Sequence, residues 1–147
     1  MGTDLHSHVE VYDRDKKRWD KVYMYAPDLW NFGKLREVEP YVGRSYTMFG
    51  VLAGVRSMTE PIVQPRDIPI DASSGVLEDW DNDSSWCHTP SWLTLAELRL
   101  AAKDKKRYNK EERRSLRPLI NGIDFMIDSS WLFKEDSEVR VVFYFDN

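Results

Sequence analysis

The sequence predicts an α+β fold in a single domain that covers residues 1–147, and three local patterns support this prediction. Residues 139–147 consist mostly of Val, Phe and Tyr, which is typical of a buried strand. Because chain ends fray unless they are held, so apolar an end must be a central strand. Two alternating segments near the N-terminus predict a β-hairpin, and capping signals between these regions predict three or four helices. We therefore expect a small antiparallel sheet, made of the N-terminal hairpin and the C-terminal strand, with helices packed on one face.

The N-terminal hairpin is expected to start with residues 9–12, to turn at residues 13–17 and to return over residues 19–25. Apolar and polar side chains alternate in both arms, and the charged segment between them has the length of a short turn. Residues 26–41 are rich in aromatic side chains but show no period, so we expect irregular structure there.

A buried helix is expected from Tyr46 to about Arg56. Ser45 can cap its first turn, and apolar residues cover most of its circumference, which is typical of a helix inside a core. Gly50 and Gly54 weaken this helix in isolation, but they let another stretch of backbone approach it closely.

The three prolines in residues 57–73 predict an extended loop. One helical turn is expected at residues 76–80, and it runs into a polar loop at residues 79–85.

Two capping boxes predict where the next helices begin. Thr94 with Glu97 forms the first box, and Asn109 with Glu112 forms the second. Pro118 interrupts the apolar spacing that follows the second box. We expect either a kinked helix or two helices, with Pro118 in the first turn of the second.

Composition narrows the class of protein. Of the 147 residues, 41% are hydrophobic and 31% are charged, as in an ordinary soluble globular protein. No apolar run approaches the roughly 18 residues that a transmembrane helix needs, and the N-terminus has no signal-peptide pattern. We therefore expect no membrane partner. A single cysteine, Cys87, excludes an internal disulfide and fits a cytoplasmic protein.

Charge is distributed unevenly along the chain. Residues 99–117 hold nine basic and three acidic residues, a net charge of +6, so the remainder of this −4 chain carries −10. Such a segment could contact phosphates or an acidic partner, or it could be a solvated loop with adjoining helix ends. The acidity of the whole chain argues against a dedicated nucleic-acid-binding protein.

The chain lacks the common catalytic signatures, so we expect no catalytic residue and no cofactor. His6 and His8 would share one face of a strand and could bind a metal with Asp4. Two histidines near a terminus are more often simply exposed, and we expect no metal site. Cys87 and His88 would point apart in an extended chain, which argues against a Cys/His catalytic pair.

Ligand-binding candidates come from three short segments that combine arginines, polar side chains and aromatic rings. Stacking on a ring together with contacts from arginine is a common way to hold a nucleotide. The polar residues just before the first capping box also lie where backbone N–H groups attract anions. The candidates are Arg44, Tyr46, Arg56, Arg66, His88, Ser91 and Trp92.

Two structural alternatives remain open for these residues. The arginines could form ordinary salt bridges, for which Asp71 and Asp79 are available partners. The polar side chains of His88, Thr89 and Ser91 could serve only to cap the helix that follows them.

Four blocks of the sequence together resemble a widespread family of small phage and prophage proteins. The blocks occur in the same order and span nearly all of the chain after residue 43. The family has a second histidine where this chain has Pro90, which puts in doubt any mechanism that needs both histidines. The blocks are Gly43-Arg-Ser-Tyr-Thr-Met-Phe-Gly-Val-Leu-Ala-Gly-Val-Arg56, Pro65-Arg-Asp-Ile-Pro-Ile-Asp71, His88-Thr-Pro-Ser-Trp-Leu-Thr-Leu-Ala-Glu-Leu98 and Val139-Arg-Val-Val-Phe-Tyr-Phe-Asp-Asn147.

The resemblance implies a phage-encoded protein that acts in the cytoplasm of a host cell, in a family without a characterised activity. The sequence favours a counter-defence protein that sequesters a small anionic ligand, such as a nucleotide immune signal. One alternative is an inhibitor that binds a host defence protein through the acidic segment 78–83 or the basic segment 99–117. A second alternative is a small nucleotide-acting enzyme with His88 as acid or base. An oligomer would suit a sequestering protein, but the sequence leaves the oligomeric state open.

Overall fold

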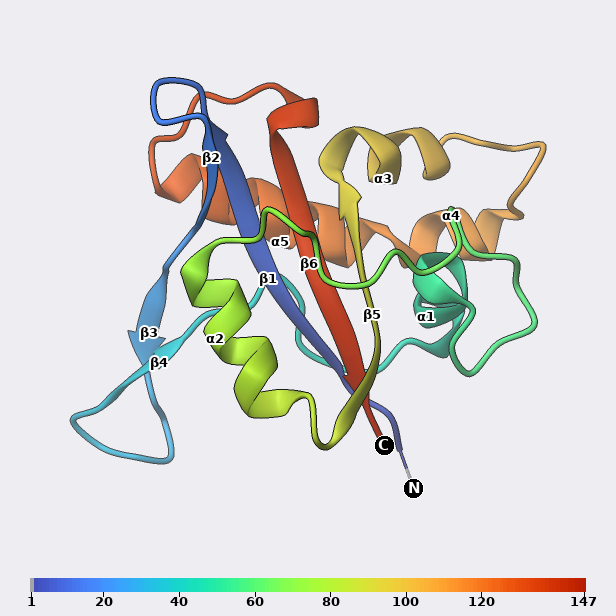
Figure 1. Cartoon of the computed structure of the whole chain (residues 1–147). Helices are drawn as coiled ribbons and strands as arrows, with labels where there is room; N and C mark the ends of the chain where they lie inside the picture. The colour runs from blue at the N-terminus through green and yellow to red at the C-terminus, as the bar shows by residue number, and fades with distance from the viewer. Residues whose placement is uncertain (1) are drawn as a thin grey trace.

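The structure is a computed structural model and describes residues 2–147. It confirms the α+β class, with a four-stranded antiparallel sheet in the order β2-β1-β6-β5 and a two-stranded sheet, β3-β4 (Figure 1). The strands are β1 Leu5–Asp13, β2 Arg18–Lys21, β3 Tyr25–Pro27, β4 Leu35–Glu37, β5 Cys87–Thr94 and β6 Val139–Asp146. The helices are α1 Tyr46–Ala53, α2 Ser74–Asp83, α3 Leu95–Ala101, α4 Lys110–Ser115, α5 Arg117–Ser129 and the 3-10 turn η1 Asp136–Glu138.

The C-terminal strand β6 lies between β1 and β5, and all but its last residue is buried. It pairs with β1 from Leu5 opposite Phe145 to Val11 opposite Val139. This pairing confirms that the apolar chain end is a central strand and that it lies beside the N-terminal hairpin.

Strand β5 was not predicted, because its sequence hides the alternating pattern of a strand. A bulge between His88 and Ser91 interrupts its pairing with β6, and Thr89 in that bulge has a positive φ of 53°. Pro90 follows, which is typical of an irregular edge strand. Beyond the bulge the pattern returns, and the side chains of Ser91 and Leu93 are buried in the core.

One face of the main sheet is apolar and carries the hydrophobic core. Val9 of β1 and Val141 and Phe143 of β6 are fully buried there. They form one cluster with Phe49 of α1 and Ile123 of α5. Burial of this apolar surface is the main source of stability for the fold.

The other face of the sheet is covered by α2 and the loop before it, so the expectation of helices on one face is wrong. Figure 1 shows α2 on one side of the sheet and α5 on the opposite side. The segment expected to form one turn is a helix of ten residues, capped by the Ser73 side chain. Helix α2 has few apolar residues, and Val76 is the one that is buried. Polar side chains of the sheet contact the region of α2 instead.

The predicted helix starts are confirmed. Ser45 caps α1, and both capping boxes form as expected at α3 and α4. Helix α1 ends at Ala53, three residues earlier than predicted, because Gly54 follows with a φ of 70° and terminates it. A Cβ on Gly50 would lie 2.5 Å from Ser57, so the chain does approach α1 closely there. Pro118 lies in the first turn of a separate helix, α5.

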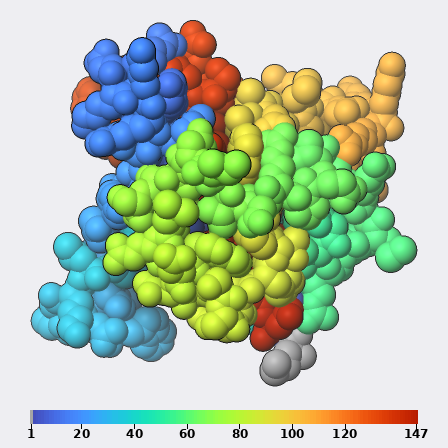
Figure 2. Space-filling view, viewed as in Figure 1, coloured from blue at the N-terminus to red at the C-terminus, as the bar shows by residue number. Residues whose placement is uncertain are grey.

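The N-terminal hairpin is confirmed as β1–β2, but its second arm ends at Lys21. The chain then leaves the main sheet, and residues 25–27 pair with residues 35–37 instead of forming irregular structure. Figures 1 and 2 show this β3–β4 hairpin as a separate projection at one end of the molecule. Among residues 2–147, no helix combines the length and apolar character needed to cross a bilayer.

Candidate functional site

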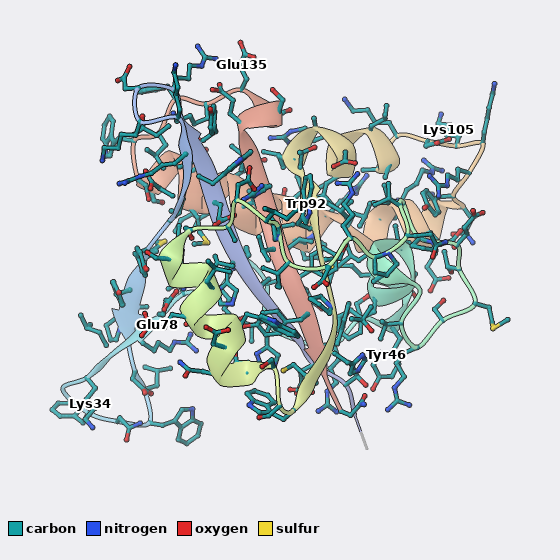
Figure 3. All side chains as sticks on the ribbon, viewed as in Figure 1. Lys34, Tyr46, Glu78, Trp92, Lys105 and Glu135 are labelled. Carbon is teal, nitrogen blue, oxygen red and sulfur yellow. The ribbon has the colours of Figure 1, made fainter. Side chains whose placement is uncertain are left out.

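The seven residues predicted to bind a ligand do not form one site. One group lies where the two chain ends meet, and the other lies on β5 and the loop beside it. Figure 3 labels one residue of each group, Tyr46 and Trp92, and the two lie in different parts of the view. The first group is Arg44, Tyr46, Arg56 and His88, whose Nε2 lies 3.0 Å from Asn147 Oδ1, and the second is Arg66, Ser91 and Trp92.

The first group ties the N-terminal segment to α1. Arg44 forms a bidentate salt bridge with Asp4, with Nε donating to Oδ1 at 2.6 Å. This hydrogen bond from Arg44 lowers the pKa of Asp4. Arg56 Nε donates to Thr3 Oγ1 at 2.9 Å, and Tyr46 Oη accepts from the Thr3 backbone N–H at 3.2 Å. The charge of Arg44 is therefore compensated within the protein.

The second group fastens the proline-rich loop to α3. The Arg66 guanidinium donates to both carboxylate oxygens of Glu97, at 2.9 and 2.6 Å, and lies 4.3 Å from the Trp92 ring. The Arg66 backbone N–H donates to Ser91 Oγ. Burial would raise the pKa of Glu97, but hydrogen bonds from Arg66 and Thr94 outweigh it and lower the pKa. All three candidates of this group are engaged with one another or with Glu97.

The salt-bridge alternative describes Arg44 and Arg66 correctly, but the expected partners are wrong. Asp71 pairs with Arg140, and Asp79 pairs with Lys21. The capping alternative is also wrong, because the polar residues of segment 88–91 lie in β5 and Thr94 alone caps α3.

A buried ion pair lies at the centre of the second face. The guanidinium of Arg140, 2% exposed, donates from Nε to Glu10, which is fully buried, at 2.7 Å. It also donates to Asp71 at 2.9 Å and stacks 4.0 Å from the Trp19 ring. Glu10 accepts a further hydrogen bond from the Ser73 N–H at 2.6 Å. The pair therefore joins the sheet to the start of α2.

A second polar chain runs from β1 to the end of α2. Tyr144 Oη donates to Asp83 at 2.7 Å and accepts from His8 Nε2 at 3.0 Å. Burial lowers the pKa of His8 to about 4, with the nearby Lys21 charge acting in the same direction, so the imidazole is neutral at pH 7. Burial, together with the Asp83 carboxylate, raises the pKa of Tyr144. Neither group is charged at neutral pH, and their contacts join α2 to the sheet.

The side chains of His8, Glu37 and Asp79 converge with ligand atoms within 4.8 Å of one another, which is a geometry that could hold a metal ion. The ammonium of Lys21 bonds to both carboxylates, at 2.5 Å to Asp79. Burial would lower the pKa of Lys21, but these hydrogen bonds outweigh it and raise the pKa. The Lys21 ammonium therefore already bridges the two carboxylates and offsets one of their two negative charges. We assign the cluster to holding the β3–β4 hairpin against α2.

Three large apolar residues at the tip of the β3–β4 hairpin are almost fully exposed to solvent. Leu29, Trp30 and Phe32 are 90%, 93% and 106% exposed, whereas large apolar side chains are normally buried. Sequence reasoning missed them because the segment shows no period. A usable signal was present, since three large apolar residues stand between two turn-forming residues, Asp28 and Gly33.

Comparisons with known protein families, with curated proteins and with solved structures find no match. The resemblance to phage proteins therefore stays a prediction, and the functional argument depends on the geometry of the chain.

Proposed function

We propose that this protein binds a host protein and that the tip of the β3–β4 hairpin is its docking element. The observation that carries the proposal is the near-complete exposure of Leu29, Trp30 and Phe32 on a projecting arm (Figure 2). Apolar groups exposed together on a soluble chain are typical of interaction sites. Trp is also the residue type most enriched among those that dominate binding energy. The sequence resemblance to phage proteins is what makes a host protein the expected partner.

Hydrogen bonds between neighbouring residues of the tip support its conformation. The Asp28 carboxylate accepts from the Trp30 N–H at 2.9 Å and from the Asn31 side chain at 3.1 Å. The Asp28 N–H donates to the Lys34 carbonyl at 2.9 Å and closes the loop. A preformed loop loses little conformational entropy on binding, so more of the contact energy appears as affinity.

The test is the substitution Trp30→Ser, with Trp131→Ser as its matched control. Both tryptophans are at least 81% exposed, but Trp131 lies outside the hairpin. The protein that wild type captures from host cells is identified, purified and titrated by calorimetry against all three chains. We expect Trp30→Ser to weaken binding by about 30-fold or more, as for a central aromatic contact, and Trp131→Ser to leave it unchanged.

The outcome that would overturn the proposal is a purified partner that binds Trp30→Ser as tightly as wild type. Equal unfolding free energies for the two variants, measured in urea, would show that the loss concerns binding and not folding. We expect both to lie within about 0.5 kcal/mol of wild type, since exposed substitutions rarely cost more.

Sequestration of a small anionic ligand is the second candidate function. It loses support at Arg44 and Arg66, whose charges are compensated inside the protein. A different group of cations, on the basic segment, favours it.

A further inference from the structure

The basic segment folds into a concave cationic site. A pocket of about 270 Å³ opens between the turn after α3, helix α4 and the start of α5. Five of its six lining residues are cationic, the sixth is alanine, and no carboxylate lines it. The lining residues are Ala102, Lys105, Lys110, Arg113, Arg114 and Arg117.

The three acidic residues of the segment are engaged away from the pocket. Asp104 accepts from the backbone N–H groups of its own turn. Glu111 lies 3.5 Å from Thr47, and Glu112 accepts from Thr59 at 2.9 Å, so both face α1 and the loop after it. Five of the nine basic residues in the segment therefore line one pocket, and its three acidic residues point elsewhere.

The five cations are not neutralised by the protein. The salt bridges among residues 2–147 include none of them. Arg113 uses Nε to donate to the Tyr108 carbonyl at 3.2 Å, which leaves its other nitrogens for a ligand. Arg44, Arg66 and Arg140, by contrast, each bond to a carboxylate.

Helix dipoles do not explain this arrangement. Arg113 and Arg114 lie in the last turn of α4, where positive charge is favourable. Lys110 and Arg117, however, are the first residues of α4 and α5, where positive charge is unfavourable. Mutual repulsion among five cations adds to this cost, and a bound anion relieves both.

From this geometry we infer a binding site for a small polyanion that carries two or more adjacent phosphate groups. Arg113, Arg114 and Arg117 supply planar guanidinium groups, which match phosphate oxygens in pairs. The pocket is smaller than the 300 to 1,000 Å³ typical of sites that enclose a whole drug-sized ligand. No aromatic ring lines it, so it recognises phosphates and leaves a nucleobase outside. Figure 3 labels Lys105 at the opposite end of the molecule from Lys34 of the hairpin, so this site is separate from the docking element.

The test is calorimetric titration with sodium triphosphate, ATP and inorganic phosphate. We expect triphosphate and ATP to bind alike, and inorganic phosphate to bind about tenfold or more weakly, because it makes fewer charge-assisted hydrogen bonds. The double variant Arg114→Ala/Arg117→Ala should weaken triphosphate binding by about tenfold or more. The control Lys103→Ala/Lys106→Ala removes the same charge from exposed positions outside the pocket and should change it by less than about threefold.

Three results would overturn the inference. The first is an equal loss of affinity in the two double variants, which would mean a diffuse basic surface. The second is displacement of triphosphate by an oligoglutamate peptide at equal charge concentration. That result would mean that the ligand is an acidic protein segment. The third is tighter binding of a single-stranded oligonucleotide than of triphosphate, when the oligonucleotide has hydroxyl groups and no phosphates at its two ends. That result would mean that the pocket binds a nucleic-acid backbone. Far-UV circular dichroism of each variant confirms that the fold is retained.

Discussion

Replacement of Arg140 by Met should destabilise the protein more than any exposed substitution. The change removes the guanidinium that bonds to Glu10 at 2.7 Å and leaves that fully buried carboxylate with the Ser73 N–H as its remaining hydrogen-bond donor. Removing one partner of a buried ion pair costs about 3–5 kcal/mol, since the other charge stays desolvated. Arg44→Met, which breaks the exposed pair with Asp4, should cost less than about 1 kcal/mol.

A double-mutant cycle measured by urea unfolding, with circular dichroism as the signal, separates the interaction from packing. Glu10→Leu combined with Arg140→Met replaces both charges by apolar groups, which is often close to neutral for a buried pair. The double variant should therefore be more stable than either single variant. A cost for Arg140→Met below about 1 kcal/mol, or strict additivity of the two single costs, would refute the claim that the buried Glu10 carboxylate depends on Arg140 as its partner.

Two further predictions concern single positions. The pKa of His8 lies near 4 in the folded chain and near 6.5 when unfolded, so the unfolded state binds the extra proton between these values. The unfolding free energy should therefore fall as pH decreases from 6.5 to 4, by up to about 3 kcal/mol. His8→Gln should flatten this fall in urea titrations, and parallel curves would contradict the assignment. A Cβ at Gly122 would lie 1.7 Å from the Pro40 carbonyl oxygen, so Gly122→Ala should lower the melting temperature despite the better helix propensity of Ala. The exposed neighbour Asn121→Ala is the control and should raise it or leave it unchanged.

The elements that the sequence predicts well are those decided by neighbouring residues. A capping box involves two side chains three residues apart, and both boxes form as expected. The start of α1 depends on the Ser45 side chain, and the central place of β6 follows from its own apolar composition. Strand β5 could not be predicted from its own residues. Thr89 and Pro90 form a bulge, and a bulge is defined only by the pairing of β5 with β6.

The candidate site could not be predicted in the same way, because an arginine has no partner until the fold brings one near. Arg44 forms its ion pair with Asp4, forty residues away in the sequence, and Arg66 forms its ion pair with Glu97, thirty-one residues away. Nothing in the spacing of these residues indicates the pairs. The basic segment is the opposite case, since its excess charge was visible in the sequence and the fold directs its acids elsewhere.

The polar interior and the apolar tip together indicate where function lies. Arg140 is 2% exposed, and the hydrogen bonds to Glu10 and Asp71 explain its burial. Phe32 is fully exposed, so its apolar ring stays in contact with water. A polar group inside the protein is thus accounted for by partners within the fold, whereas for the apolar tip we propose a partner outside it. The same reasoning applies to Arg114 and Arg117, which line a pocket that contains no carboxylate. The two proposed sites therefore differ in chemistry, since an apolar tip suits the surface of a protein partner and a cationic pocket suits a polyanion.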